Sequence, residues 1–135
     1  MRYLLDTNTC IRYLSGRSQP VFERLNAIPE SDIAVCSVVK FELRFGALRS
    51  QAVEKNLEEQ AAFLNRYESL PFDDVVHVHA ARIRADLANA GTPIGPYDIL
   101  IAATALAHNL ILVTHNTKEF GRIAGLKIED WESED

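Results

Sequence analysis

Tyr3-Leu4-Leu5-Asp6-Thr7 is the stretch of sequence that decides the fold. Three apolar residues end at Asp6, and from Thr7 to Leu14 apolar residues recur at helical spacing. A short buried strand therefore passes directly into a helix, with Asp6 or Thr7 as the helix cap. This order is typical of α/β proteins that are built on a parallel sheet.

The same alternation of strands and helices continues along the chain. Further strands are predicted at 33–36, 110–114 and near 126–128, with an extended edge piece at 70–72, and helices at 18–28, 37–48, 53–67, 75–90 and 97–108. A turn is predicted around 116–120. The pattern predicts one α/β domain over residues 1–128, with a short, mostly parallel central sheet of four or five strands flanked by helices. An acidic C-terminal tail is expected over 129–135.

The length and composition exclude several classes of protein. A chain of 135 residues with 47% apolar and 24% charged residues is suited to one globular domain, not to a disordered or collagen-like protein. The longest apolar run, 99–107, is too short for a membrane span, and the early carboxylate of Asp6 argues against a signal peptide. We therefore expect a cytosolic protein with no membrane partner. Cys10 and Cys36 form no CxxC motif and are expected to be buried thiols.

The net charge of −5 comes from the C-terminal tail. Its seven residues hold five of the 19 acids, and the rest of the chain has 14 acids and 14 Lys plus Arg. A general basic surface for nucleic acid is therefore absent. A local basic surface and an ordinary solvated rim both stay open for six cations of the first third, namely Arg12, Arg17, Arg24, Lys40, Arg44 and Arg49.

Three acids occur in apolar surroundings rather than on polar surfaces. Asp6 ends the first strand, Glu42 lies on the helix after the second strand, and Asp98 opens the most apolar helix. Each alone can be a helix cap or a surface residue, but the expected topology brings all three to the carboxyl edge of the sheet. Carboxylates there repel by roughly 4 kcal/mol per pair at about 4 Å, so they need protons or a cation. Without a His or Cys partner they favour Mg²⁺ or Mn²⁺.

Polar residues also follow the fourth strand. Asn116 can complete a metal site through its amide oxygen, and Glu119 can add a carboxylate, although a turn or helix-start role is equally open for both. Thr7, Asn8 and Thr114 can hydrogen-bond to phosphate or to metal-bound water. Of the four histidines, which share no metal-ligand spacing, the one adjacent to this site is His115.

These motifs together resemble a known family of nucleases. Leu4-Leu5-Asp6-Thr7-Asn8, Glu42, Gly95-Pro96-Tyr97-Asp98 and the segment 114–120 are similar, in this order and spacing, to PIN-domain ribonucleases, and most closely to the VapC toxins of VapBC toxin–antitoxin modules. The resemblance runs from residue 3 to about residue 128. It implies that Asp6, Glu42 and Asp98 bind one or two Mg²⁺ or Mn²⁺ ions. The usual fourth acid is Asn116 here, which makes Glu119 a candidate substitute.

The resemblance also implies a function and partners. The expected function is a divalent-metal-dependent endoribonuclease that cuts structured RNA, such as initiator tRNA in its anticodon stem-loop, and thereby inhibits translation. A VapB-like antitoxin would neutralise it, and operator DNA would be bound only through that antitoxin. Two other functions are compatible with the acids: a non-catalytic module for a basic partner, and an aspartyl-phosphate phosphatase. The phosphatase normally needs an Asp where this chain has Asn8.

Two interaction surfaces are expected as well. A homodimer is predicted through an apolar helix surface that carries Phe45, Leu48, Leu57 and Phe63. Apolar grooves between the 10–14 and 41–45 helix faces are predicted to take an amphipathic helix of the antitoxin. A basic side chain of that partner, such as Arg, would then enter the acidic site.

Overall fold

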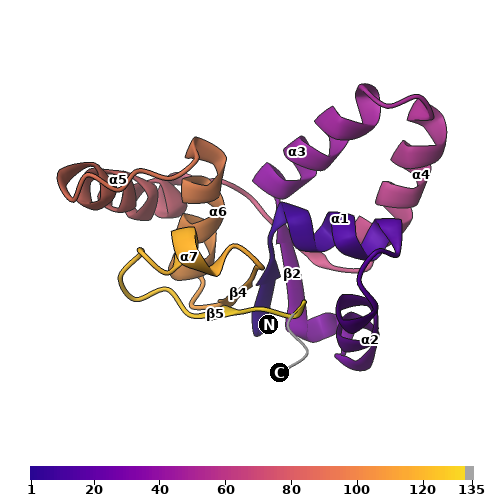
Figure 1. Ribbon diagram of the computed structural model, residues 1–135, viewed down its shortest axis with the longest axis horizontal. Helices are drawn as coiled ribbons and strands as arrows, with labels where there is room; N and C mark the ends of the chain where they lie inside the picture. The colour runs from indigo at the N-terminus through magenta and orange to yellow at the C-terminus, as the bar shows by residue number, and fades with distance from the viewer. Residues whose placement is uncertain (133–135) are drawn as a thin grey trace.

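The centre of the fold is a parallel sheet of short strands. The computed structural model describes residues 1–132, and within them the sheet has five strands (Figure 1). Their order across the sheet is β3 (Glu68–Leu70), β2 (Ile33–Cys36), β1 (Tyr3–Leu5), β4 (Ile111–Val113) and β5 (Ile128–Glu129), all parallel. The predicted α/β class and parallel sheet are therefore confirmed.

The central strand β1 explains why the first apolar run is continuous rather than alternating. All three of its residues are buried, because β1 pairs with β2 on one side and β4 on the other and helices cover the sheet. The edge strand β3 begins and ends two residues earlier than the predicted extended piece at 70–72. It ends at Leu70 because Pro71, which follows, has no N–H to donate to a neighbouring strand.

Seven α-helices connect these strands within the described residues. They are α1 (Thr7–Ser15), α2 (Gln19–Ala27), α3 (Ser37–Leu48), α4 (Val53–Leu64), α5 (Asp74–Asn89), α6 (Pro96–Ala107) and α7 (Thr117–Phe120), with a short 3₁₀ turn at Glu30–Asp32. Helix α3 packs on α4 and helix α5 on α6, and Figure 1 shows the two pairs on opposite sides of the sheet. Helix α4 ends three residues before the predicted limit of residue 67, where the chain turns into β3.

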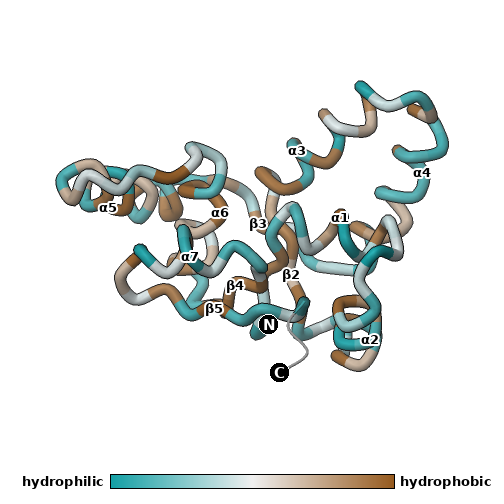
Figure 2. The backbone as a smooth tube through the Cα atoms, viewed as in Figure 1, coloured by the Kyte–Doolittle hydropathy of each residue, from teal (hydrophilic) through white to brown (hydrophobic). Residues whose placement is uncertain are grey.

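Hydrophobic residues concentrate in the central strands, whereas most of α4 is hydrophilic (Figure 2). Cys10 and Cys36 are buried free thiols, as predicted, and burial raises the pKa of the Cys36 thiol to about 11. In the part of the chain that the structure describes, no helix combines the length and hydrophobicity needed to cross a bilayer.

Part of the segment expected as an acidic tail packs with the domain. Glu129 belongs to β5, and the indole ring of Trp131 is 2% exposed and contacts the ring of Tyr3 edge to face, with ring centres 5.2 Å apart. The sheet and core therefore extend beyond residue 128. The end of the predicted tail, 133–135, lies outside the described residues.

Candidate active site

Asp6 lies at the carboxyl end of the central strand and is the most buried acid of the site, at 4% exposed. Its carboxylate caps α1 by accepting a hydrogen bond from the backbone N–H of Thr9 at 2.8 Å. Burial raises the pKa of Asp6, while hydrogen bonds from Thr114 and Thr9 act in the opposite direction. The strand, the cap and the threonine together fix this carboxylate in one place.

Glu42 lies on α3, in the second turn after β2, and is half-buried. The hydroxyl of Thr7, the first residue of α1, donates a hydrogen bond of 2.6 Å to Glu42 Oε1. This bond joins residues that are 35 positions apart and holds the Glu42 carboxylate beside the end of β1. Thr7 thus positions an acid of the site.

Asp98 lies in the first turn of α6, where the charges of the other acids affect its pKa. The pKa of Asp98 is raised to about 6, chiefly by burial, and then by the negative charges of Glu42, Asp6 and Glu119. Four carboxylates from four parts of the chain therefore gather at the carboxyl edge of the sheet. This is the gathering that the order of strands and helices predicted for Asp6, Glu42 and Asp98.

Asn116 and Glu119 form a pair at the start of α7. The Asn116 side-chain N–H donates to Glu119 Oε2 at 2.9 Å, and its backbone N–H donates to the Thr114 hydroxyl at 3.0 Å. The amide of Asn116 therefore orients the Glu119 carboxylate and keeps its own oxygen available. Asn8 is exposed and makes no side-chain hydrogen bond to any described residue.

This set of acids fits a hard divalent cation. Within residues 1–132, none of Asp6, Glu42, Asp98 and Glu119 pairs with a Lys or Arg, so their charge is not neutralised by the protein. Among the described residues these acids do not form a tight group of three, but their donors are all oxygen atoms, as Mg²⁺ and Mn²⁺ prefer. A cation here would offset their mutual repulsion.

The raised pKa of Asp98 predicts how the stability of the chelator-treated protein depends on pH. Folding favours the protonated form of Asp98, so this group lowers the folded state's stability progressively as pH rises from about 4 to about 6. Asp98→Asn removes this cost. We expect the variant to melt above the unsubstituted protein at pH 7, with the difference vanishing below pH 4, as measured by circular dichroism melts. If the variant and the unsubstituted protein melt at the same temperature at pH 7 as well as below pH 4, this prediction is wrong.

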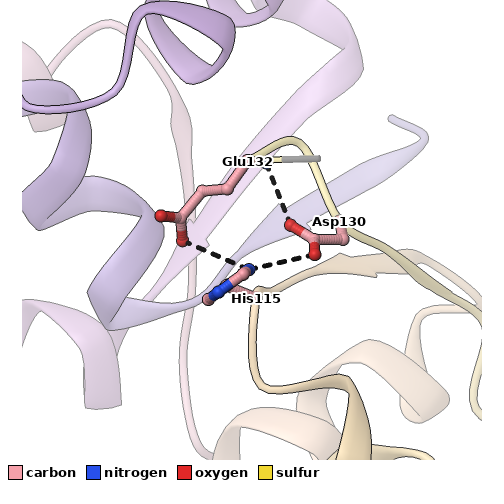
Figure 3. Close-up of side chains that lie close together, drawn as sticks. All are labelled: His115, Asp130 and Glu132. Carbon is pink, nitrogen blue, oxygen red and sulfur yellow. Dashed lines mark hydrogen bonds and ion pairs between the residues drawn. The ribbon is translucent and has the colours of Figure 1, made fainter. Parts of the chain in front are cut away.

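A second cluster of ionisable side chains lies close by and was not predicted. His115, Asp130 and Glu132 meet where the segment after β4 passes the segment after β5 (Figure 3). Asp130 and Glu132 belong to the segment expected as an acidic tail. The available signal was Trp131, because a tryptophan within an acidic segment indicates that the segment packs on the domain.

The exposed apolar residues correct the predicted interaction surfaces. Phe63 is 3% exposed and stacks on Tyr13, so it belongs to the core and the prediction that it lies on a dimer surface was wrong. Phe45 and Leu48 are each 56% exposed. The groove between the 10–14 and 41–45 faces stays a prediction: Cys10 is fully buried, whereas Phe41 and Phe45 are exposed.

A hollow at this face lies between α3 and α6. It measures about 230 Å³ and is lined by Ser37, Val38, Phe41, Tyr97 and Leu100. The rings of Phe41 and Tyr97 contact each other across it, with centres 5.3 Å apart. Phe41 and Tyr97 directly precede Glu42 and Asp98 in their helices, so a partner seated here would lie beside the acids.

Comparison with known proteins agrees with this geometry. Residues 3–126 match the PIN domain family. The chain is 42% identical to "tRNA(fMet)-specific endonuclease VapC" of Salmonella typhimurium and 40% identical to the protein of the same name from Shigella flexneri, covering 97% of this chain and 98% of each relative. The crystal structure of DNA-bound VapBC from Salmonella typhimurium superposes with a TM-score of 0.92 over 97% of this chain and 98% of the other, at 42% identity. The chain therefore belongs to the PIN-domain family and, within it, to the VapC proteins.

Proposed function

We propose that this protein is a divalent-metal-dependent endoribonuclease, the toxin of a toxin–antitoxin pair, and that it cuts tRNA in the cytosol. The observation that supports the proposal is the placement of four acids without a Lys or Arg partner among the described residues. Asp6 lies at the end of β1, Glu42 is bonded to Thr7 beside it, Asp98 opens α6, and Glu119 is bonded to Asn116 after β4. The names of the VapC relatives support tRNA, and initiator tRNA in particular, as the substrate.

In this proposal, some residues of the site would hold the metal and others position the acids. Asp6 and Asp98 would hold the divalent ion, which when bound polarises water and neutralises charge on the phosphate. Thr7 holds Glu42, which either contacts the ion or orients the attacking water. Thr114 holds Asp6, and Asn116 holds Glu119. Hydrolysis by water would leave a 5′-phosphate and a 3′-hydroxyl.

A cleavage assay tests this function. Purified protein is incubated with initiator tRNA and, as a control, an elongator tRNA, each with Mg²⁺, with Mn²⁺ or with a chelator. We expect a discrete cut in the initiator tRNA that leaves a 5′-phosphate end, and only when Mg²⁺ or Mn²⁺ is present. Equal cleavage with the chelator would contradict metal dependence, and no cleavage of any tRNA would contradict the proposed substrate.

The antitoxin is proposed to inhibit by two contacts. Its apolar helix would cover the hollow between Phe41 and Tyr97, and a basic side chain would bind among the carboxylates of the site. Because that side chain competes with metal, replacing the antitoxin's C-terminal Arg and Lys residues singly should weaken inhibition, most clearly at high Mg²⁺. Full inhibition by every variant at all Mg²⁺ concentrations would exclude this route. Binding to operator DNA is proposed to occur only through the antitoxin.

A homodimer is also proposed, because Phe45 and Leu48 remain exposed on α3 and present an apolar surface. Pairing through this surface would place two acidic sites along one structured RNA. Sedimentation at micromolar concentration should show a dimer that Phe45→Glu converts to a monomer. A monomer in the unsubstituted protein would contradict the proposal.

A further inference from the structure

The cluster of His115, Asp130 and Glu132 brings three different ligand groups together. His115 Nδ1 lies 3.0 Å from Asp130 Oδ2 and 3.9 Å from Glu132 Oε2, and all three ligand atoms are within 4.8 Å of one another (Figure 3). It is the one such group of three or more His, Cys, Asp or Glu side chains in residues 1–132. The carboxylates of the proposed active site do not form a comparable group.

The second oxygen of each carboxylate in the cluster already has a partner. Asp130 Oδ1 accepts the backbone N–H of Glu132 at 2.9 Å, and Glu132 Oε1 pairs with Arg12 Nε at 3.3 Å. Each acid is thereby oriented with one oxygen toward His115. The two acids are mostly shielded, at 22% and 16% exposed, whereas the imidazole of His115 is 61% exposed and leaves a path for entry.

A single proton does not satisfy this arrangement. A proton placed on His115 Nδ1 would be within hydrogen-bond distance of Asp130 at 3.0 Å but not of Glu132 at 3.9 Å, so the facing oxygen of Glu132 would be left without a donor from this nitrogen. A metal ion in place of the proton would contact all three atoms. Metal–ligand bonds of about 2.0–2.2 Å put neighbouring ligand atoms about 3.0–3.5 Å apart. The His115–Asp130 spacing of 3.0 Å already lies in this range, and the His115–Glu132 spacing of 3.9 Å would have to shorten slightly on binding.

We propose that His115, Asp130 and Glu132 form a binding site for a transition-metal dication, with Zn²⁺ as the best match. One imidazole nitrogen and two carboxylate oxygens suit zinc, with water in the remaining position, whereas Mg²⁺ prefers oxygen ligands alone. The site is separate from the Asp6–Asp98 carboxylates and does not depend on the proposed ribonuclease activity.

Such an ion would join two distant parts of the chain. His115 lies between β4 and α7, and the two acids follow β5, so the ion would fasten the C-terminal segment to the strand next to β1. Glu132 is also near enough to Asp6 to raise the pKa of that carboxyl. Zn²⁺ binding should therefore raise the melting temperature and add positive charge beside the active site.

Binding of the metal alone tests the site in the full chain. Chelator-treated protein is titrated with Zn²⁺ by calorimetry, and with Co²⁺ by visible absorption, which reports ligand number and type. We expect one tight Zn²⁺ per chain. His115→Gln and Glu132→Gln should each weaken it by more than the roughly 10- to 100-fold that loss of an outer partner of a ligand costs.

Two matched controls keep the outcome decisive. His108→Gln removes an exposed histidine at the end of α6, and Asp98→Asn removes an acid of the other site; both should leave Zn²⁺ affinity unchanged. Unchanged affinity in both cluster variants, or equal loss in Asp98→Asn, would overturn the proposal. So would thiolate-type Co²⁺ absorption, which would place the metal on Cys10 or Cys36. If His115→Gln does not fold, Glu132→Gln alone decides.

Discussion

Asp98→Asn should reduce tRNA cleavage by more than about 100-fold at saturating Mg²⁺, a larger loss than removal of an outer partner of a metal ligand causes. The carboxamide keeps the size and first-turn position of Asp98 but removes one of the charges that would hold the ion. The fold should survive, because burial and the neighbouring acids raise the pKa of Asp98, so its charge is unfavourable where it lies. Asp6→Asn should behave likewise in activity.

The matched control for this variant is Asp74→Asn. Asp74 also lies in the first turn of a helix, α5, but it is exposed and away from the cluster of acids. Its replacement should leave cleavage and melting temperature unchanged. Cleavage at the normal rate by correctly folded Asp98→Asn protein, measured by gel assay under single-turnover conditions, would exclude Asp98 as a metal ligand.

The location of these acids was predictable because topology alone decides it. In a parallel sheet, every strand delivers its carboxyl end to the same edge, and this places Asp6 there. Helix α3 leaves that edge after β2, and helix α6 begins at it before the chain returns into β4, so Glu42 and Asp98 are brought to the same edge. No detailed side-chain geometry was needed for that inference. The hydrogen bonds that orient the acids, such as Thr7 to Glu42, depend on how α1 packs against α3 and were beyond the sequence pattern.

The side of a helix that faces the core was harder to predict. Helical spacing places Leu57 and Phe63 on an apolar helix surface, but whether solvent or another helix covers them depends on how that helix packs. Phe63 stacks on Tyr13 of α1 and contacts Tyr67, which buries it. Phe45 lies one helix earlier and stays exposed. Apolar residues with the same spacing therefore have different environments.

The packing of the C-terminal segment on the domain could not be predicted, because the segment is dominated by charged residues. Five acids among seven residues suggest a solvated tail, yet Glu129 pairs with Arg24 at 3.1 Å and joins β5. His115 and Asp130 are 15 positions apart, and only the register of β5 on β4 brings their segments together. A short two-residue strand carries too little hydrophobic pattern to predict that register.

Trp131→Ala should therefore cost about 3–5 kcal/mol of the free energy of unfolding, a large share of the roughly 5–15 kcal/mol of a typical domain. The indole is 2% exposed, packs edge to face on Tyr3 of the central strand, and donates its N–H to Glu129 at 3.1 Å. Removing it leaves a cavity beneath β1 and releases the segment that carries Asp130 and Glu132. The measurement is urea denaturation followed by circular dichroism.

Phe72→Ala is the matched control for this loss. Phe72 is also aromatic but is 40% exposed, in the loop after β3, so its removal should change the free energy of unfolding by less than about 1 kcal/mol. Trp131→Phe should recover part of the loss, since a smaller ring still fills much of the space against Tyr3. If Trp131→Ala is no less stable than Phe72→Ala, the C-terminal segment does not contribute to the core. In that case, the sheet edge at β5 and the metal cluster that depends on it are not stably formed in solution.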